Sequence, residues 1–143
     1  MERALGAQQF LARIFLLAAG VQFFLAGLAV FRAKPHGNDK LFESSSFDAH
    51  RVVGDFMILV AFALLVLAVV NRERLRIAAL LFALMLIQYG LAYVGDSVAA
   101  LGALHPLNGV LVLFVGHLLA RRRKRAREEK RPPEKPPPEP APA

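Results

Sequence analysis

The sequence predicts an all-α integral membrane protein, a four-helix up-and-down bundle followed by a disordered tail. Composition is the first observation: 56% of the 143 residues are hydrophobic and the mean hydropathy is +0.45, more than a soluble domain of this size can bury. The second is that the apolar residues form four long runs, as membrane-spanning helices do. These runs are residues 14–31, 52–70, 77–94 and 106–120.

The ends of the runs carry helix signals. The first run is interpreted as a retained helix, because it is longer than the apolar region of a signal peptide and no cleavage site follows it. Ser and Asp residues in "SSSFDAH" are expected to cap the second helix. Pro106 is expected at the first position of the fourth helix, where its missing N–H costs nothing.

Positive charge predicts the orientation. The net charge is +7, and eight of the 18 basic residues lie between Arg121 and Arg131, directly after the fourth run. With Arg72, Arg74 and Arg76 they would share one side of the membrane, so both termini are expected in the cytoplasm of the cell. This distribution indicates a topology signal that touches lipid headgroups, and nucleic acid is not an expected partner.

The chain divides into a membrane bundle, residues 1–120, and a tail, residues 121–143. The tail is basic at first and then rich in proline, "RPPEKPPPEPAPA". It has no apolar run to bury, so we expect it to be disordered on the cytoplasmic side.

Polar residues gather in the outer half of the predicted bundle. The third run has Gln88, Tyr89 and Tyr93 near its outer end, whereas residues 77–87 contain no polar side chain. Channels and proton-coupled transporters need polar steps across the whole membrane. A single site near the outer face fits this pattern better.

Two histidines are candidate ligands at that outer level. His50 opens the second run and His105 opens the fourth, and these helices are diagonal partners in an up-and-down bundle. Two imidazoles facing each other could hold haem b as axial ligands. The chain has no cysteine, which excludes c-type haem and thiolate metal sites. Arg51 or Tyr93 would then meet a haem carboxylate.

The remaining histidines and glycines refine this hypothesis. Gly54 and Gly109 each lie four residues after a candidate ligand, on the same helix face, and would leave room for a flat ring. His117 lies twelve residues beyond His105, too deep to share a site with it, and His36 lies in the outer loop.

A simpler reading remains open for both candidates. His105 precedes a proline, which disfavours helical backbone, so it could be a helix cap or an interfacial residue. His50 could equally be an interfacial side chain beside Arg51.

The segments "FDAHRVVGDFMILVAFALLVLAVV" and "ALHPLNGVLVLFVGHLLARR" resemble a family of uncharacterised bacterial four-helix membrane proteins. That resemblance implies a histidine entering the second helix and a Leu-His-Pro-x-Asn segment entering the fourth. The chain is more weakly similar to one half of haem A synthase, which implies haem-ligating histidines on the second and fourth helices. That family has a glutamate shortly before its first histidine, and here Glu43 is seven residues back and Asp48 two back.

Three functions follow as hypotheses. The first is a small membrane protein that binds one haem b for electron transfer or redox sensing. The second is a structural or assembly subunit, partnered by other membrane subunits or by a second copy, and the third is a small transporter. None requires a catalytic residue, and an enzyme is not expected.

Overall fold

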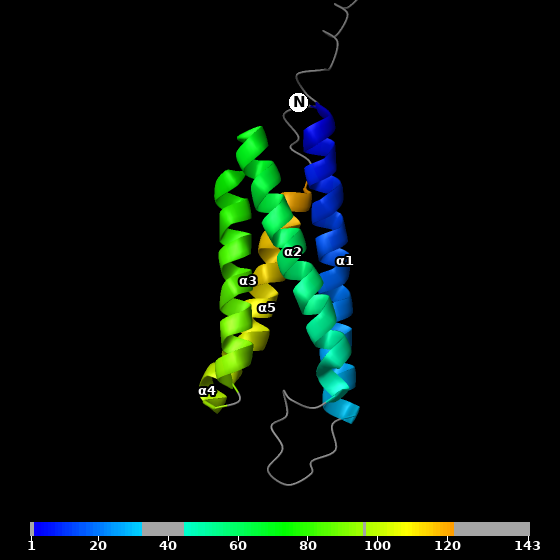
Figure 1. The fold of residues 1–143 in the computed structure, drawn as a ribbon, viewed down its shortest axis with the longest axis vertical. Helices are drawn as coiled ribbons and strands as arrows, with labels where there is room; N and C mark the ends of the chain where they lie inside the picture. Colours follow the sequence, from blue (N-terminus) through cyan, green and yellow to red (C-terminus); the bar gives the residue numbers. More distant parts are fainter. Residues whose placement is uncertain (1, 33–44, 96, 122–143) are drawn as a thin grey trace, which may run out of the picture.

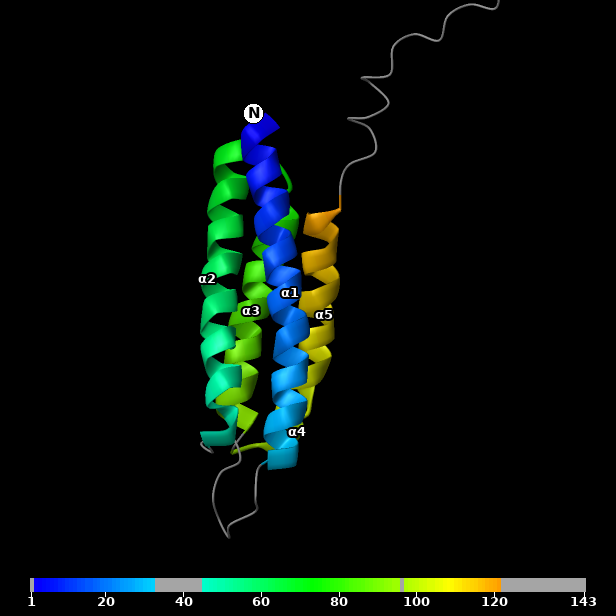
Figure 2. The same cartoon turned by 90° about the vertical axis from the view of Figure 1, so that its right-hand side faces the viewer.

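The computed structural model describes the backbone of residues 2–32, 45–95 and 97–121, with side chains from Gly6 onward (Figures 1 and 2). It consists of helices, and the residues described contain no strand. The predicted tail and the outer loop with His36 lie outside the described residues, apart from Arg121. The elements are α1 (Glu2–Arg32), η2 (Ser45–Phe47), α2 (Asp48–Asn71), α3 (Leu75–Gly95), α4 (Ala99–Gly102) and α5 (Leu104–Ala120).

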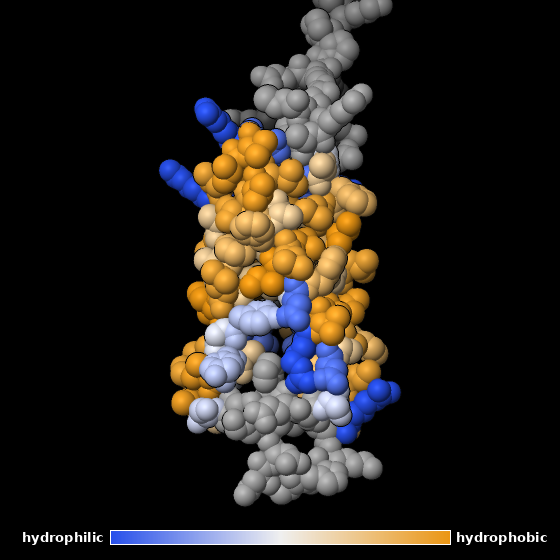
Figure 3. Space-filling model, viewed as in Figure 1, coloured by the Kyte–Doolittle hydropathy of each residue, from blue (hydrophilic) through white to orange (hydrophobic). Residues whose placement is uncertain are grey.

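The predicted membrane class is confirmed. Four helical segments are long and apolar enough to cross a bilayer: Gly6–Arg32, Ser45–Asn71, Leu75–Gly95 and Ala99–Ala120. Most of their residues are not buried inside the bundle, and large apolar side chains such as Leu17 and Val70 are 72% exposed. Figure 3 shows this hydrophobic belt on one face of the molecule. Such a belt is stable only against lipid, so the chain is a multi-pass membrane protein.

The four long helices form an up-and-down square. Each packs on two neighbours, in the order α1, α2, α3, α5 and back to α1. The helices α2 and α5 are therefore diagonal partners, as predicted (Figure 1). We call the end where α2 and α5 begin the histidine end, and the opposite end, where α2 turns into α3, the arginine end.

The helices extend beyond the apolar runs because a hydropathy run marks only the apolar middle of a helix. The expected Ser and Asp caps of the second helix are wrong: its N-cap is Phe47, which follows a 3-10 turn and makes no side-chain cap bond. Asp48 instead pairs with Arg51 in the first turn of α2. Pro106 is the third residue of α5, not the first. Its missing N–H is still harmless there, because first-turn N–H groups have no partner inside a helix.

A short helix, α4, was not predicted. It packs against the end of α3 through two glycines, Gly95 and Gly102. A Cβ atom added at Gly95 would lie 2.7 Å from the Cα of Gly102, so Gly95 has no room for a side chain, and a Cβ at Gly102 would make a tight contact of 3.1 Å with the Cα of Gly95. This contact lets the chain reverse direction at the histidine end.

Arg74 forms a clasp at the arginine end. It lies in the α2–α3 turn with a positive φ of 57°. Its Nη1 donates to the carbonyl oxygens of Leu118 and Leu119 at 3.0 and 2.6 Å, and its Nη2 donates to that of Arg121 at 2.7 Å. These are carbonyls that the end of a helix leaves without intrahelical donors. The clasp thus ties the α2–α3 hairpin to α5.

Candidate functional site

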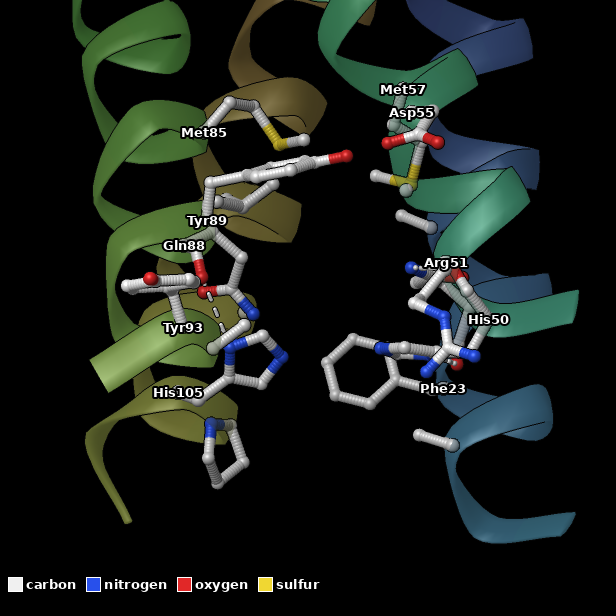
Figure 4. A pocket seen from close by; sticks show the side chains of 18 residues that line it. Phe23, His50, Arg51, Asp55, Met57, Met85, Gln88, Tyr89, Tyr93 and His105 are labelled. Atoms are coloured by element: carbon white, nitrogen blue, oxygen red, sulfur yellow. Dashed lines mark hydrogen bonds between the residues drawn. The ribbon is translucent and has the colours of Figure 1, made fainter. Parts of the chain in front are cut away.

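A cavity of about 310 Å³ lies in the histidine half of the bundle and is lined by all four spanning helices (Figure 4). All four residues proposed from the sequence line it: His50, Arg51, Tyr93 and His105. Most of the other lining residues are apolar or small. The four residues that the sequence places at the histidine end therefore surround a cavity.

The two histidines face this space from diagonal helices. His50 is the third residue of α2 and His105 the second residue of α5. Their ring centroids are 6.2 Å apart, and the ring planes are tilted by 55°. Both side chains are half-buried. The rings of Phe47 and His50 pack nearly perpendicular to each other, with their centroids 6.0 Å apart.

Each imidazole is held by a backbone carbonyl of the neighbouring helix. The Nδ1 of His50 lies 3.3 Å from the carbonyl oxygen of Gln22, and the Nδ1 of His105 lies 3.1 Å from that of Gln88. A carbonyl oxygen only accepts, so each Nδ1 must carry the proton. The lone pair of each neutral ring is therefore on Nε2, as in histidines that bind metals through this atom. In Figure 4 the second nitrogen of His105 points into the cavity.

The helix-cap reading of His105 is wrong. The N-cap of α5 is Ala103, and no side chain caps this helix. The imidazole bonds across to α3 instead. The bias that proline imposes on the preceding residue is overridden here, because the turn from α4 already sets helical backbone at Ala103.

The two carbonyl acceptors belong to an internal repeat that the sequence interpretation missed. Residues 22–26 read "QFFLA" and residues 88–92 read "QYGLA". Each segment is followed by a histidine with a glycine four residues later, "HRVVG" from His50 and "HPLNG" from His105. The α1–α2 and α3–α5 hairpins are thus equivalent halves, and each half supplies one imidazole and its carbonyl partner. Comparing the four spans with one another would have revealed this signal.

Glutamine side chains brace each half differently. The Nε2 of Gln22 donates to the carbonyl of His50 at 2.8 Å and joins α1 to α2. In the other half, buried Asn108 donates from Nδ2 to the carbonyl of Leu84 at 2.9 Å and to Oε1 of Gln88 at 2.6 Å. Both arrangements fix the helix pair within one turn of the histidine.

The two glycines that follow the histidines line the cavity, as the sequence suggested. A Cβ at Gly54 would lie 3.1 Å from Nε2 of Gln22, and a Cβ at Gly109 would lie 3.5 Å from Nε2 of Gln88 and from the ring of Phe23. These glycines therefore let the glutamine side chains pack close to α2 and α5, and they leave space in the cavity that larger side chains would fill.

Apart from the histidines and glutamines, which both halves contribute, the polar residues of the cavity lie on one side. Arg51 and Asp55 of α2 and Tyr89 and Tyr93 of α3 lie along the side where these two helices diverge (Figure 4). Figure 3 shows hydrophilic residues grouped around a hollow at this place, within the otherwise apolar belt. We call these four residues the polar rim.

The cavity is closed toward the arginine end. Met57 and Met85 form its floor, and beyond them lies the apolar core of the bundle. The largest fully buried side chains of that core are Phe15, Leu64, Leu81 and Leu119. A polar path through the bundle is therefore interrupted in this conformation.

The other histidines stay outside the site. His117 is exposed on α5 and borders a separate apolar groove, and His36 is in the segment outside the described residues. Among the residues that the structure describes, no group of three or more His, Asp or Glu side chains could hold a metal ion.

Comparison with known proteins gives a match to a protein family. The model of a family of unknown function (DUF6220) matches residues 22–95, a little over half of the chain. The matched region contains Gln22, His50, Asp55 and Gln88 and ends before His105. Searches of curated proteins and of solved structures found no match. The uncharacterised-family interpretation agrees with this result, and the weaker similarity to haem A synthase gains no support from it.

Proposed function

Because the chain belongs to the family of unknown function (DUF6220), which carries no assigned activity, we propose its function from the site: it is a small membrane protein that binds one haem b between His50 and His105 and transfers single electrons. The observation that carries this proposal is the pair of imidazoles on diagonal helices, each with Nδ1 bound to a backbone carbonyl.

The separation of the rings supports the proposal. A metal–imidazole bond is about 2 Å long, and the ring centre lies roughly 1 Å behind the ligating nitrogen, so two axial imidazoles have centres roughly 6 Å apart. The observed centroid distance is 6.2 Å. The carbonyl bonds also fix the tautomer that leaves Nε2 available on both rings.

The number of ligands favours haem over a bare ion. A structural zinc site takes four protein ligands and a catalytic one takes three, and the described residues contain no group of three or more such side chains that could hold a metal ion. A porphyrin supplies its own four nitrogens and needs two axial ligands from the protein.

The cavity suits a flat apolar ring with an acidic edge. Its volume of about 310 Å³ is at the lower end for a ligand site, but the cavity is open between α2 and α3. Its walls include small residues, Ala19, Ala26, Gly54, Ala92 and Gly109. Arg51 and Tyr93 stand at the open side, where they would bind the carboxylates.

Two axial histidines would leave no open position on the iron, which favours electron transfer or redox sensing over oxygen chemistry. The chain itself would hold the group, exclude water with its apolar walls and orient both ligands. The apolar core beyond Met57 and Met85 speaks against the transporter hypothesis, because it offers a polar solute no path.

The test is the visible spectrum of protein expressed with ample haem. We expect a Soret band, one haem per chain, and a low-spin spectrum that His50→Ala and His105→Ala each abolish. His117→Ala is the matched control and should leave the spectrum unchanged. Wild-type protein that is folded by circular dichroism and monodisperse, but has no Soret band, would overturn the proposal and favour the structural-subunit hypothesis.

A further inference from the structure

The internal repeat gives a reference for judging the cavity walls. Nearly every lining residue has a lining counterpart in the other half: Gln22 pairs with Gln88, Ala26 with Ala92 and Met57 with Val112. Among the lining residues, Asp55 and Tyr93 alone have none. The positions equivalent to them are Val110 and Gly27.

The remaining members of the polar rim differ chemically from their counterparts. Arg51 corresponds to Pro106, and Tyr89 corresponds to Phe23. The α1–α5 side is therefore apolar at every position where the α2–α3 side is polar. Since the α1–α5 side packs well without such groups, neither the fold nor the histidine pair needs them.

Asp55 is the strongest sign of a ligand. It lies ten residues into the span Ser45–Asn71, about 15 Å along the helix axis. Its side chain is exposed at the edge of the cavity, and no hydrogen bond or ion pair holds it among the described residues. A carboxylate within a membrane span is costly and as a rule has a functional partner.

From this asymmetry we infer that the opening between α2 and α3 binds a lipid-soluble hydroquinone, whose ring hydroxyl donates a hydrogen bond to Asp55. Both helices that border the opening are candidate membrane spans, so a ligand that enters between them comes from the bilayer and has an apolar body. A carboxylate accepts hydrogen bonds and repels other acids, so the head of the ligand carries a neutral donor. Tyr89 extends its hydroxyl across the cavity toward the side of Asp55 (Figure 4) and can bond a second oxygen.

This ligand and the histidine pair occupy different levels. Asp55 and Tyr89 lie nearer the floor formed by Met57 and Met85, whereas His105 and Phe23 lie nearer the histidine end (Figure 4). Recognition of a hydroxylated ring follows from the rim alone. The choice of a hydroquinone, a phenol that also yields electrons, rests on the proposed function, because an electron-transfer protein needs a donor.

The test measures binding without electron transfer. Full-length protein in lipid nanodiscs is kept reduced with dithionite, and equilibrium dialysis compares a decyl-substituted hydroquinone with its dimethyl ether, which has no hydroxyl donor. We expect saturable binding of the hydroquinone, at least tenfold tighter than that of the ether. Asp55→Val introduces the residue of the equivalent position in α5 and should remove this tenfold preference. Asp55→Asn should reduce the preference without removing it, because a charge-assisted hydrogen bond is about twice as strong as a neutral one.

Glu73→Gln is the matched control, since Glu73 is a carboxylate in the α2–α3 turn at the arginine end and does not line the cavity. It should bind both probes like the wild type. Equal affinity for the two probes, or an Asp55→Val variant that keeps the preference, would overturn the inference. Because the readout needs no haem, absence of a Soret band contradicts only the proposed function and leaves this result interpretable.

Discussion

The Arg74 clasp leads to a quantitative prediction about how the bundle holds together. Replacing Arg74 with methionine keeps much of the aliphatic stem and removes the three hydrogen bonds to the end of α5. The bond to Arg121 is exposed and contributes little. The two part-buried bonds, at the lower bound of about 1.5 kcal/mol for a charged donor, give an expected loss of about 3 kcal/mol in the free energy of unfolding.

Backbone strain allows a second, independent check. Arg72 and Arg74 both have positive φ, 54° and 57°, which costs a non-glycine residue roughly 1–2 kcal/mol. Arg74→Gly should therefore destabilise the protein by about 1 kcal/mol less than Arg74→Met. Arg72 caps α2 through its own backbone, and among the described residues its side chain makes no hydrogen bond to α5. Arg72→Met should therefore be nearly neutral, and Arg72→Gly should stabilise the protein by about 1 kcal/mol.

The assay is unfolding in mixed micelles by titration with sodium dodecyl sulfate, followed by far-ultraviolet circular dichroism. If Arg74→Met unfolds within about 0.5 kcal/mol of the wild type, the spread expected for uninvolved surface positions, the clasp contributes nothing and the reasoning is refuted.

Three further predictions follow from the same contacts. Asn108→Leu removes a buried donor that serves two acceptors and should lower the free energy of unfolding by about 1–3 kcal/mol. Gln22→Leu should cost less, because it loses one bond and also removes an unpaired buried Oε1. The same titration compares the two variants, and the reverse order of stability would contradict the assigned network. Gly95→Ala should disrupt the α3–α4 contact and reduce the yield of monodisperse protein, whereas Gly90→Ala, with open space around its Cβ, should stabilise by up to about 1 kcal/mol. Cysteines at Ser45, Asn71 and Ala141 test the orientation with an impermeant thiol reagent on intact cells: labelling of Ser45→Cys alone is expected, and labelling of the other two with protection of Ser45→Cys would invert the topology.

The class of fold was predictable because membrane solvation acts on whole segments. Runs of apolar residues locate the four spans, and alternation of direction then makes the second and fourth spans diagonal partners. The level shared by His50 and His105 follows from the same reasoning. Helix ends were less predictable: the first turn of α2 uses Phe47 as N-cap, and α4 depends on a glycine contact between two segments.

The contacts that the sequence did not predict involve backbone groups, or side chains that bond to residues far away in the sequence. The acceptors for both imidazoles are main-chain carbonyls of Gln22 and Gln88, and any residue type carries such a carbonyl. Arg74 was interpreted as a topology signal, and its bonds to residues 44 to 47 positions away have no local signature. The asymmetry of the polar rim becomes visible only when the two hairpins are compared position by position.

The equivalence of the two hairpins also has a consequence for how this protein can be taken apart. Each hairpin carries its own imidazole, carbonyl acceptor and glycine, and the histidine pair forms only when the two associate. The covalent link through Arg72 and Glu73 is thus dispensable in principle for the pair. Two co-expressed fragments, one ending and the other beginning at this link, should reassemble in the membrane. A single hairpin engineered to form a homodimer would present two facing imidazoles from a chain half as long.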